Sequence, residues 1–162
     1  CAGNPTNPDW IYFSNNLAPR TFTSTDLLKI NTGDGQRIMR LESFKLNELI
    51  VYKQSSIFVV DISGATPLVD WTVQPISRSI GLASTRAIID LGNDQWFISS
   101  EPFAIRSLVR TAYDKLMIDM VSQPIQDIFD GTGSRTINKT VSTTVEKIND
   151  KLVVLYTFFL SR

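Results

Sequence analysis

The stretch from Arg37 to Ile62 constrains the fold most, because it contains three consecutive strand-like runs separated by short polar corners. The runs are "RIMRLESF", "NELIVYKQ" and "SIFVVDI", and Val, Ile, Phe and Tyr are prominent in them. Such β-branched and aromatic residues favour strands. Ser55 and Ser56 suit a tight connection between the second and third runs. This pattern predicts an antiparallel β-meander.

A similar set of strands follows. The run "DWTVQPIS" contains Pro75, which cannot donate to a strand ladder and therefore predicts an edge strand or a bulge. Three more runs, "RAIIDLG", "QWFISS" and "FAIRSL", are separated by turn residues. They predict a second antiparallel meander.

The two meanders can be superposed along the sequence. Asn47 and Glu48 in the first correspond to Asn93 and Asp94 in the second, an offset of 46 positions (93 − 47). Residues on the following strands keep this offset: Ile50 with Trp96, Val51 with Phe97, Ile57 with Phe103, and Val59 with Ile105. The sequence thus places an Asn and an acid before equivalent strands.

The opening "NPDWIYFS" and the late "NDKLVVLY" resemble the same corner, which suggests repeat-like units at about 7–46, 47–92, 93–148 and 149–162. Repeats of 40 to 50 residues that each form a short antiparallel set are typical of β-propeller blades. We therefore expect residues 1–162 to form one domain, or a fragment of a larger propeller protein. The alternative is coincidence, because Asn and Asp are favoured in turns of any β-rich chain.

The C-terminal third mixes helical and strand signals. Apolar residues at helical spacing predict an amphipathic helix over 105–121, with Arg110, Asp114 and Lys115 on its polar face. The segment "PIQDIF" predicts a second, short helix with Pro124 in its first turn. The alternating "TVSTTVEKI" predicts a strand that pairs with the final one through a turn at Asn149 and Asp150. The predicted fold class is mainly β with one or two short helices.

The composition argues against some classes of function but does not identify one. Sixteen basic and sixteen acidic residues cancel, so charge offers no argument for a nucleic-acid or anionic-membrane partner. The apolar runs are too short to span a bilayer. Histidine, the commonest general base and metal ligand, does not occur. The chain begins with its single cysteine, Cys1, rather than Met, which we interpret as a processed or excised fragment.

No motif predicts catalysis, a cofactor or a metal. The segments "TGDGQR" and "DGTGSR" lack the Lys of a phosphate loop and the spaced acids of a calcium loop, and are typical of turns. Asp90, Asp94 and Glu101 lie near predicted strand ends, where an acid pair would suit a glycan-cleaving enzyme. Solvated corners are the simpler interpretation of these carboxylates.

Aromatic residues give the alternative of a carbohydrate-binding, lectin-like module. Trp10 and Trp71 would serve as sugar platforms if they were exposed. Trp96, at the start of a predicted inner strand, favours burial between neighbouring blades.

Four segments together carry a resemblance to a known family: "GNPTNPDWIYFS", "FKLNELIVYKQSSIFVVDISG", "LGNDQWFISSEPFAIRSL" and "VSQPIQDIF". The chain resembles tail-associated structural proteins of tailed bacteriophages, in particular the propeller-bearing nozzle or tubular proteins of short-tailed phages. The resemblance spans roughly residues 3–129. It departs from the pattern at "EPF", where a turn of Asp-Gly type is usual.

The resemblance implies a non-enzymatic virion protein that forms oligomers around a channel. Its partners would be further copies of itself or other tail proteins. It transfers no catalytic residue to this chain.

Overall fold

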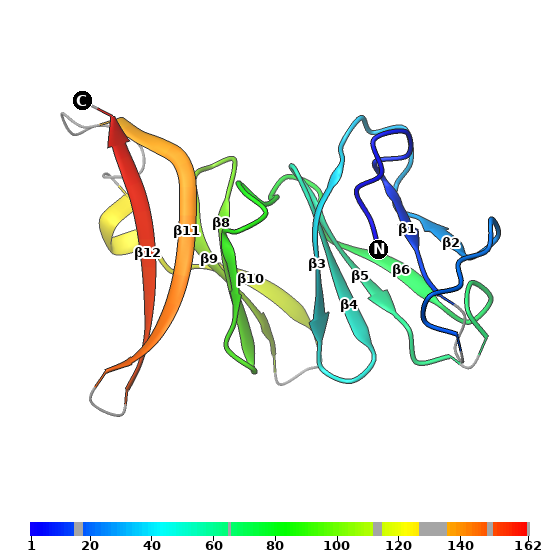
Figure 1. The fold of residues 1–162 in the computed structure, drawn as a ribbon. Coiled ribbons are helices and arrows are strands. Elements are labelled where there is room, and N and C mark those ends of the chain that lie inside the picture. Colours follow the sequence, from blue (N-terminus) through cyan, green and yellow to red (C-terminus); the bar gives the residue numbers. More distant parts are fainter. Residues whose placement is uncertain (15–17, 65, 112–114, 127–135, 149–150, 162) are drawn as a thin grey trace. The chain divides into compact units, whose positions relative to one another are not determined.

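The protein is mainly β and its sheets are antiparallel (Figure 1). The computed structural model describes residues 1–14, 18–64, 66–111, 115–126, 136–148 and 151–161, with only the backbone for Ile125 and the last two ranges. The chain divides into two compact units, Cys1–Arg78 and Ser79–Arg162. Each unit is described separately below.

The first unit contains a strand pair and a four-stranded sheet. The pair consists of β1 (Trp10–Tyr12) and β2 (Leu27–Lys29). The sheet follows chain order, with β3 (Ile38–Phe44), β4 (Glu48–Lys53), β5 (Ile57–Asp61) and β6 (Thr72–Ser77). The three-strand meander expected from residues 37–62 is therefore confirmed, and β6 extends it.

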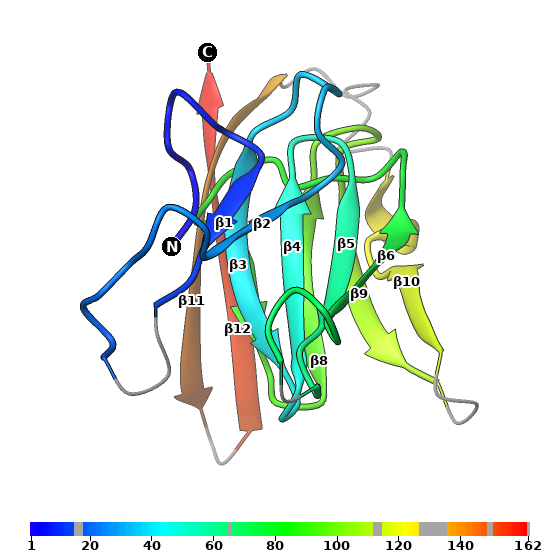
Figure 2. The same cartoon turned by 90° about the vertical axis from the view of Figure 1, so that its right-hand side faces the viewer.

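The core of the first unit lies between the strand pair and one face of the four-stranded sheet, which β1 and β2 overlie in both views (Figures 1 and 2). Ile11 on β1 and Ile30, next to the end of β2, pack with residues of the sheet. The sheet contributes four buried side chains: Ile38, Val51, Phe58 and Val60. This apolar contact holds the short N-terminal pair in place, because two isolated strands are marginally stable in water.

Pro75 lies at a sheet edge, where a residue without a backbone N–H is tolerated. It lies on β6, the edge strand of the sheet, opposite Phe58 and beside a register shift between Ile57 and Phe58. Proline lacks a backbone N–H, so it disturbs the ladder least at an edge or a bulge. The prediction for this strand is confirmed on both counts.

The second unit repeats the four-strand arrangement and adds a hairpin. The sheet is formed by β7 (Ile88–Asp90), β8 (Asp94–Ser99), β9 (Ala104–Arg110) and β10 (Leu116–Met120). A 3-10 turn, η1 (Gln123–Ile125), comes next. The hairpin pairs β11 (Thr136–Ile148) with β12 (Lys151–Ser161), which confirms the predicted final strand pair. The predicted turn at 149–150 lies outside the described residues.

The predicted helix over 105–121 is wrong. Residues in this range form most of β9 and all of β10, which pair with Leu108 opposite Ile118. Burial explains the misleading spacing: Arg106, Ser107 and Leu108 are consecutive and all buried, so β9 is covered on both faces. A strand buried on both faces has no period-two pattern, and its apolar residues can match a helical period by chance.

The second predicted helix, in "PIQDIF", is reduced to η1 and the residue after it. Residues 127–129 of that segment lie outside the described part of the chain. The structure therefore supports the β part of the predicted fold class and not the helices.

The two Asn-plus-acid corners lie at equivalent places. β4 begins at Glu48 directly after Asn47, and β8 begins at Asp94 directly after Asn93. Each strand is the second of its four-stranded antiparallel sheet. The offset of 46 residues thus relates strands with the same topological position.

Candidate functional site

The two tryptophans predicted as sugar platforms lie in separate aromatic contacts of the first unit. Trp10, on β1, is half-buried; the Lys29 Nζ atom lies 4.7 Å from its ring centroid, and the Tyr12 ring lies 6.2 Å away. Trp71 is half-buried and packs on Phe13 at 4.9 Å. The cation over Trp10 engages a surface that a sugar would use.

Two indole N–H groups lie buried without a hydrogen-bond partner among the described residues, those of Trp71 and Trp96. Trp96 is half-buried on β8, opposite Ile89 and Ser107. The half-buried ring is therefore not a fully exposed platform.

Asp94 and Glu101, two of the carboxylates considered for acid–base chemistry, do not form a pair. Asp94 begins β8 and Glu101 follows its end, so the strand rise of about 3.3 Å per residue separates them by roughly 17 Å or more. Glycosidase carboxylates lie within about 10 Å of each other. Asp90 accepts a hydrogen bond from the Gly92 N–H at 2.8 Å, an ordinary turn contact.

A buried ion pair in the first unit was not predicted. The Lys53 side chain, at the end of β4, is 0% exposed, and its Nζ lies 2.7 Å from both carboxylate oxygens of Asp34. Nζ also donates to the carbonyl oxygens of Ile30 at 3.1 Å and Asn31 at 3.4 Å. The "TGDGQR" turn is therefore anchored to the sheet by a lysine 19 positions away in sequence.

The environment of Asp34 favours its charged form. Burial by itself raises the pKa of Asp34, but hydrogen bonds from Lys53, the Gln36 backbone and Asn31, together with the Lys53 charge, lower it below 3.8. Gln36 continues the connection, since its Oε1 accepts from the Ser55 N–H at 3.0 Å and the Ser56 hydroxyl at 3.1 Å. This cluster uses its polar groups internally and has a structural role.

A second buried cation lies in the other unit. Arg106 on β9 donates through Nε to the Ser99 hydroxyl oxygen at 2.9 Å. The same hydroxyl donates to the Pro102 carbonyl, so the arginine supports the turn between β8 and β9. Burial lowers the pKa of Arg106.

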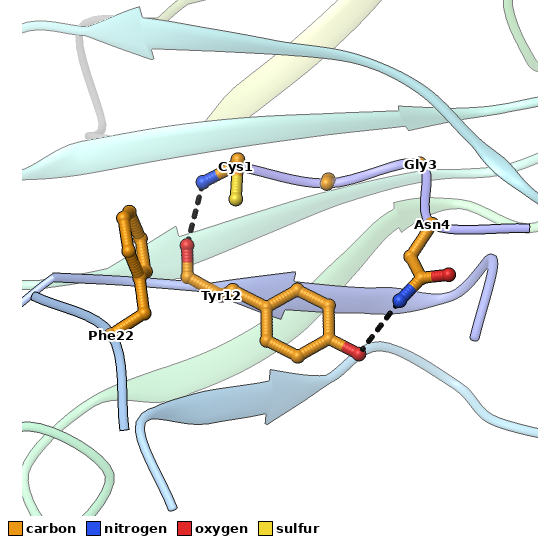
Figure 3. Close-up of a pocket in the computed structure, with 6 residues that line it drawn as sticks. Cys1, Gly3, Asn4, Tyr12 and Phe22 are labelled. Carbon is orange, nitrogen blue, oxygen red and sulfur yellow. Dashed lines mark hydrogen bonds between the residues drawn. The ribbon is translucent and has the colours of Figure 1, made fainter. Parts of the chain in front are cut away.

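A pocket of about 420 Å³ lies beside β1 (Figure 3). Cys1, Ala2, Gly3, Asn4, Tyr12 and Phe22 line it. The Cys1 amino group donates to the Tyr12 carbonyl at 2.6 Å. The Tyr12 hydroxyl accepts from the Asn4 amide at 3.4 Å and the Asn7 amide at 3.2 Å. Sequence reasoning missed this site because the lining comes from a loop, a strand and a second loop.

The sheet edges form another candidate site. The first sheet has edges at β3, which carries an Arg40–Glu42 ion pair at 2.6 Å, and at β6 with Pro75. The second sheet has edges at the three-residue β7 and at β10. Charge, proline and short length all discourage the addition of a strand. β10 has neither proline nor a basic residue; its one charged residue is Asp119, and its Met117 is 45% exposed.

Comparisons with other proteins leave the family unassigned: no protein-family model matches the chain, and no curated protein matches it either. In the described part of the chain, no group of three or more Cys, Asp or Glu side chains is placed to hold a metal ion. No helix within the described ranges has the length and hydrophobicity needed to cross a membrane.

Proposed function

We propose that this chain is a non-enzymatic structural component of a phage tail or prophage-derived particle, and that it assembles through the edge of β10. The phage context comes from the sequence resemblance over residues 3–129. The observation that carries the assembly role is the repetition of one four-stranded meander in two sheets, one of which ends, among the described residues, in an edge strand without proline or a basic residue.

Burial in the central strands supports a blade-like arrangement of each sheet. On β4, four consecutive residues, Ile50 to Lys53, are buried, and on β8 the three residues Phe97 to Ser99 are buried. Neighbouring residues of a strand point to opposite faces, so both faces are covered at the second strand of each sheet. Propeller blades have this property because each sheet packs between two others.

The hydrogen-bond pattern of β10 shows which of its residues face outward. Thr111 N–H donates to Lys115 O, and Val121 N–H donates to Ile105 O, so the bonded pairs along β9 and β10 alternate between these points. Ile118, opposite Leu108, falls in a non-bonded pair. Its N–H and C=O therefore point away from β9, toward a strand that a second copy would add.

Substitution of Ile118 tests the proposal. Ile118→Pro removes the outward N–H and leaves the bonds to β9 in place, whereas Ile118→Ala shortens the same side chain and retains the N–H. We expect the wild type and Ile118→Ala to form oligomers in light scattering, and Ile118→Pro to have the mass of one chain. A wild type that stays monomeric at all concentrations would contradict the proposal.

A further inference from the structure

We propose that the pocket lined by Cys1–Asn4, Tyr12 and Phe22 binds a neutral sugar ring, such as a hexopyranose unit of a glycan. This activity goes beyond a structural role. It also assigns carbohydrate binding to residues other than Trp10 and Trp71. The pocket volume of about 420 Å³ lies within the range of small-molecule sites, about 300–1,000 Å³.

Two aromatic side chains supply the apolar surface of the pocket. Phe22 is 49% exposed although it is a large hydrophobic residue, and it contributes to the lining. Figure 3 shows the Tyr12 ring between Phe22 and Asn4. The C–H groups on one face of a pyranose ring pack well on aromatic rings, because such rings are broad, apolar and rigid.

The Tyr12 hydroxyl supplies a directed polar contact. An amide nitrogen can only donate, so the bonds from Asn4 and Asn7 use the oxygen of this hydroxyl and leave its hydrogen unused. The described residues provide no acceptor for that hydrogen. A sugar hydroxyl in the pocket would accept it, and the exposed Asn4 amide lies beside the same position.

The charge of the lining favours a neutral ligand. The Cys1 amino group carries a positive charge but donates to the Tyr12 carbonyl at 2.6 Å. The polar side chains of the lining are an amide, a phenol and a thiol, and none of the six side chains is acidic or basic. A phosphate or carboxylate ligand would normally be bound by Arg or Lys. Aromatic rings together with amide and hydroxyl groups instead suit a molecule with an apolar face and several hydroxyls.

Sugar binding can be measured through the reactivity of Cys1, because it is the single cysteine, is exposed and lines the pocket. The rate of Cys1 alkylation by N-ethylmaleimide would be measured with glucose, galactose, mannose or N-acetylglucosamine. Sorbitol is the control ligand, because it carries hydroxyls without a ring face. At about ten times the Kd, a bound sugar should reduce the rate roughly tenfold, since about one pocket in ten stays empty.

Three variants decide whether protection arises in this pocket. Phe22→Ala should abolish it, and Tyr12→Phe should weaken it while circular dichroism confirms the fold. Leu46→Ala, which shortens a side chain that is 95% exposed and outside the lining, should leave protection unchanged. The proposal is overturned if no sugar protects Cys1, if sorbitol protects it equally, or if Phe22→Ala retains full protection.

Discussion

The side chain of Lys53 shows how one residue can organise a distant loop. A lysine is rarely buried unless it is paired, and here Asp34 and two backbone carbonyls occupy its three donors. The ammonium group ties residues 30–36 to the end of β4. The stability of the first unit should therefore depend on both partners of this pair.

Lys53→Met tests that dependence. It leaves the carboxylate of Asp34 in a partly buried position without its cation, so we expect a loss of about 3–5 kcal/mol in the free energy of unfolding. Adding Asp34→Asn to Lys53→Met should restore part of the loss, because the uncompensated charge is then gone. Urea denaturation of the three proteins measures both effects, and equal stability of the wild type and Lys53→Met would contradict the assigned role.

The lowered pKa of Asp34 predicts acid sensitivity. The folded state holds this carboxyl below its unfolded value of 3.8, so protonation favours unfolding. The contribution of the pair is complete above that value and is lost as pH falls toward the lower folded pKa. In urea denaturation between about pH 5 and pH 2, the wild type should lose more stability than Asp34→Asn. Parallel pH profiles would show that the pair does not contribute.

At the scale of the strand, the outer edge of β10 is the surface through which we propose that copies of the chain assemble. Alternate amides of this strand face β9, and the others face outward. An edge strand without proline or a basic residue leaves its outward N–H and C=O groups available for pairing. The sequence pattern predicts a helix across β9 and β10, because burial of β9 on both faces removes the period of two from that strand.

Amide hydrogen exchange can measure, for each residue of β10, whether its N–H is hydrogen-bonded. In a single chain, the amides of Leu116, Ile118 and Met120 should exchange fast, while those of Met117 and Asp119 are protected by bonds to β9. Assembly through this edge should slow the first three. Unchanged exchange of these three amides in an oligomer would place the interface elsewhere.

For the whole molecule, the offset of 46 residues predicts that the residues at equivalent positions both contribute to stability. Val51 and Phe97 are both 0% exposed and occupy the same place in the two sheets. Val51→Ala should cost about 1.5–3 kcal/mol and Phe97→Ala about 3–5 kcal/mol. Leu46→Ala, on an exposed turn, should cost almost nothing. Chemical denaturation of the three variants checks this order, and a neutral Phe97→Ala would contradict it.

The sequence alone determined where most strands of the two meanders begin and end. Corners such as Asn93–Asp94 and the β-branched runs after them depend on local backbone preferences, which neighbouring residues set. The edge position of Pro75 was predictable for the same reason, since the missing N–H is a property of the residue itself. The phage role and the sugar platforms at Trp10 and Trp71 stay predictions.

Only the tertiary structure decided the rest. Whether residues 105–121 form a helix depends on burial of both faces of β9, which arises from packing and not from local spacing. The pairing of Lys53 with Asp34 and the pocket of Tyr12 and Phe22 join residues far apart in the chain. Their side chains meet because folding packs separate loops against strands, and no local pattern in the sequence predicts these contacts.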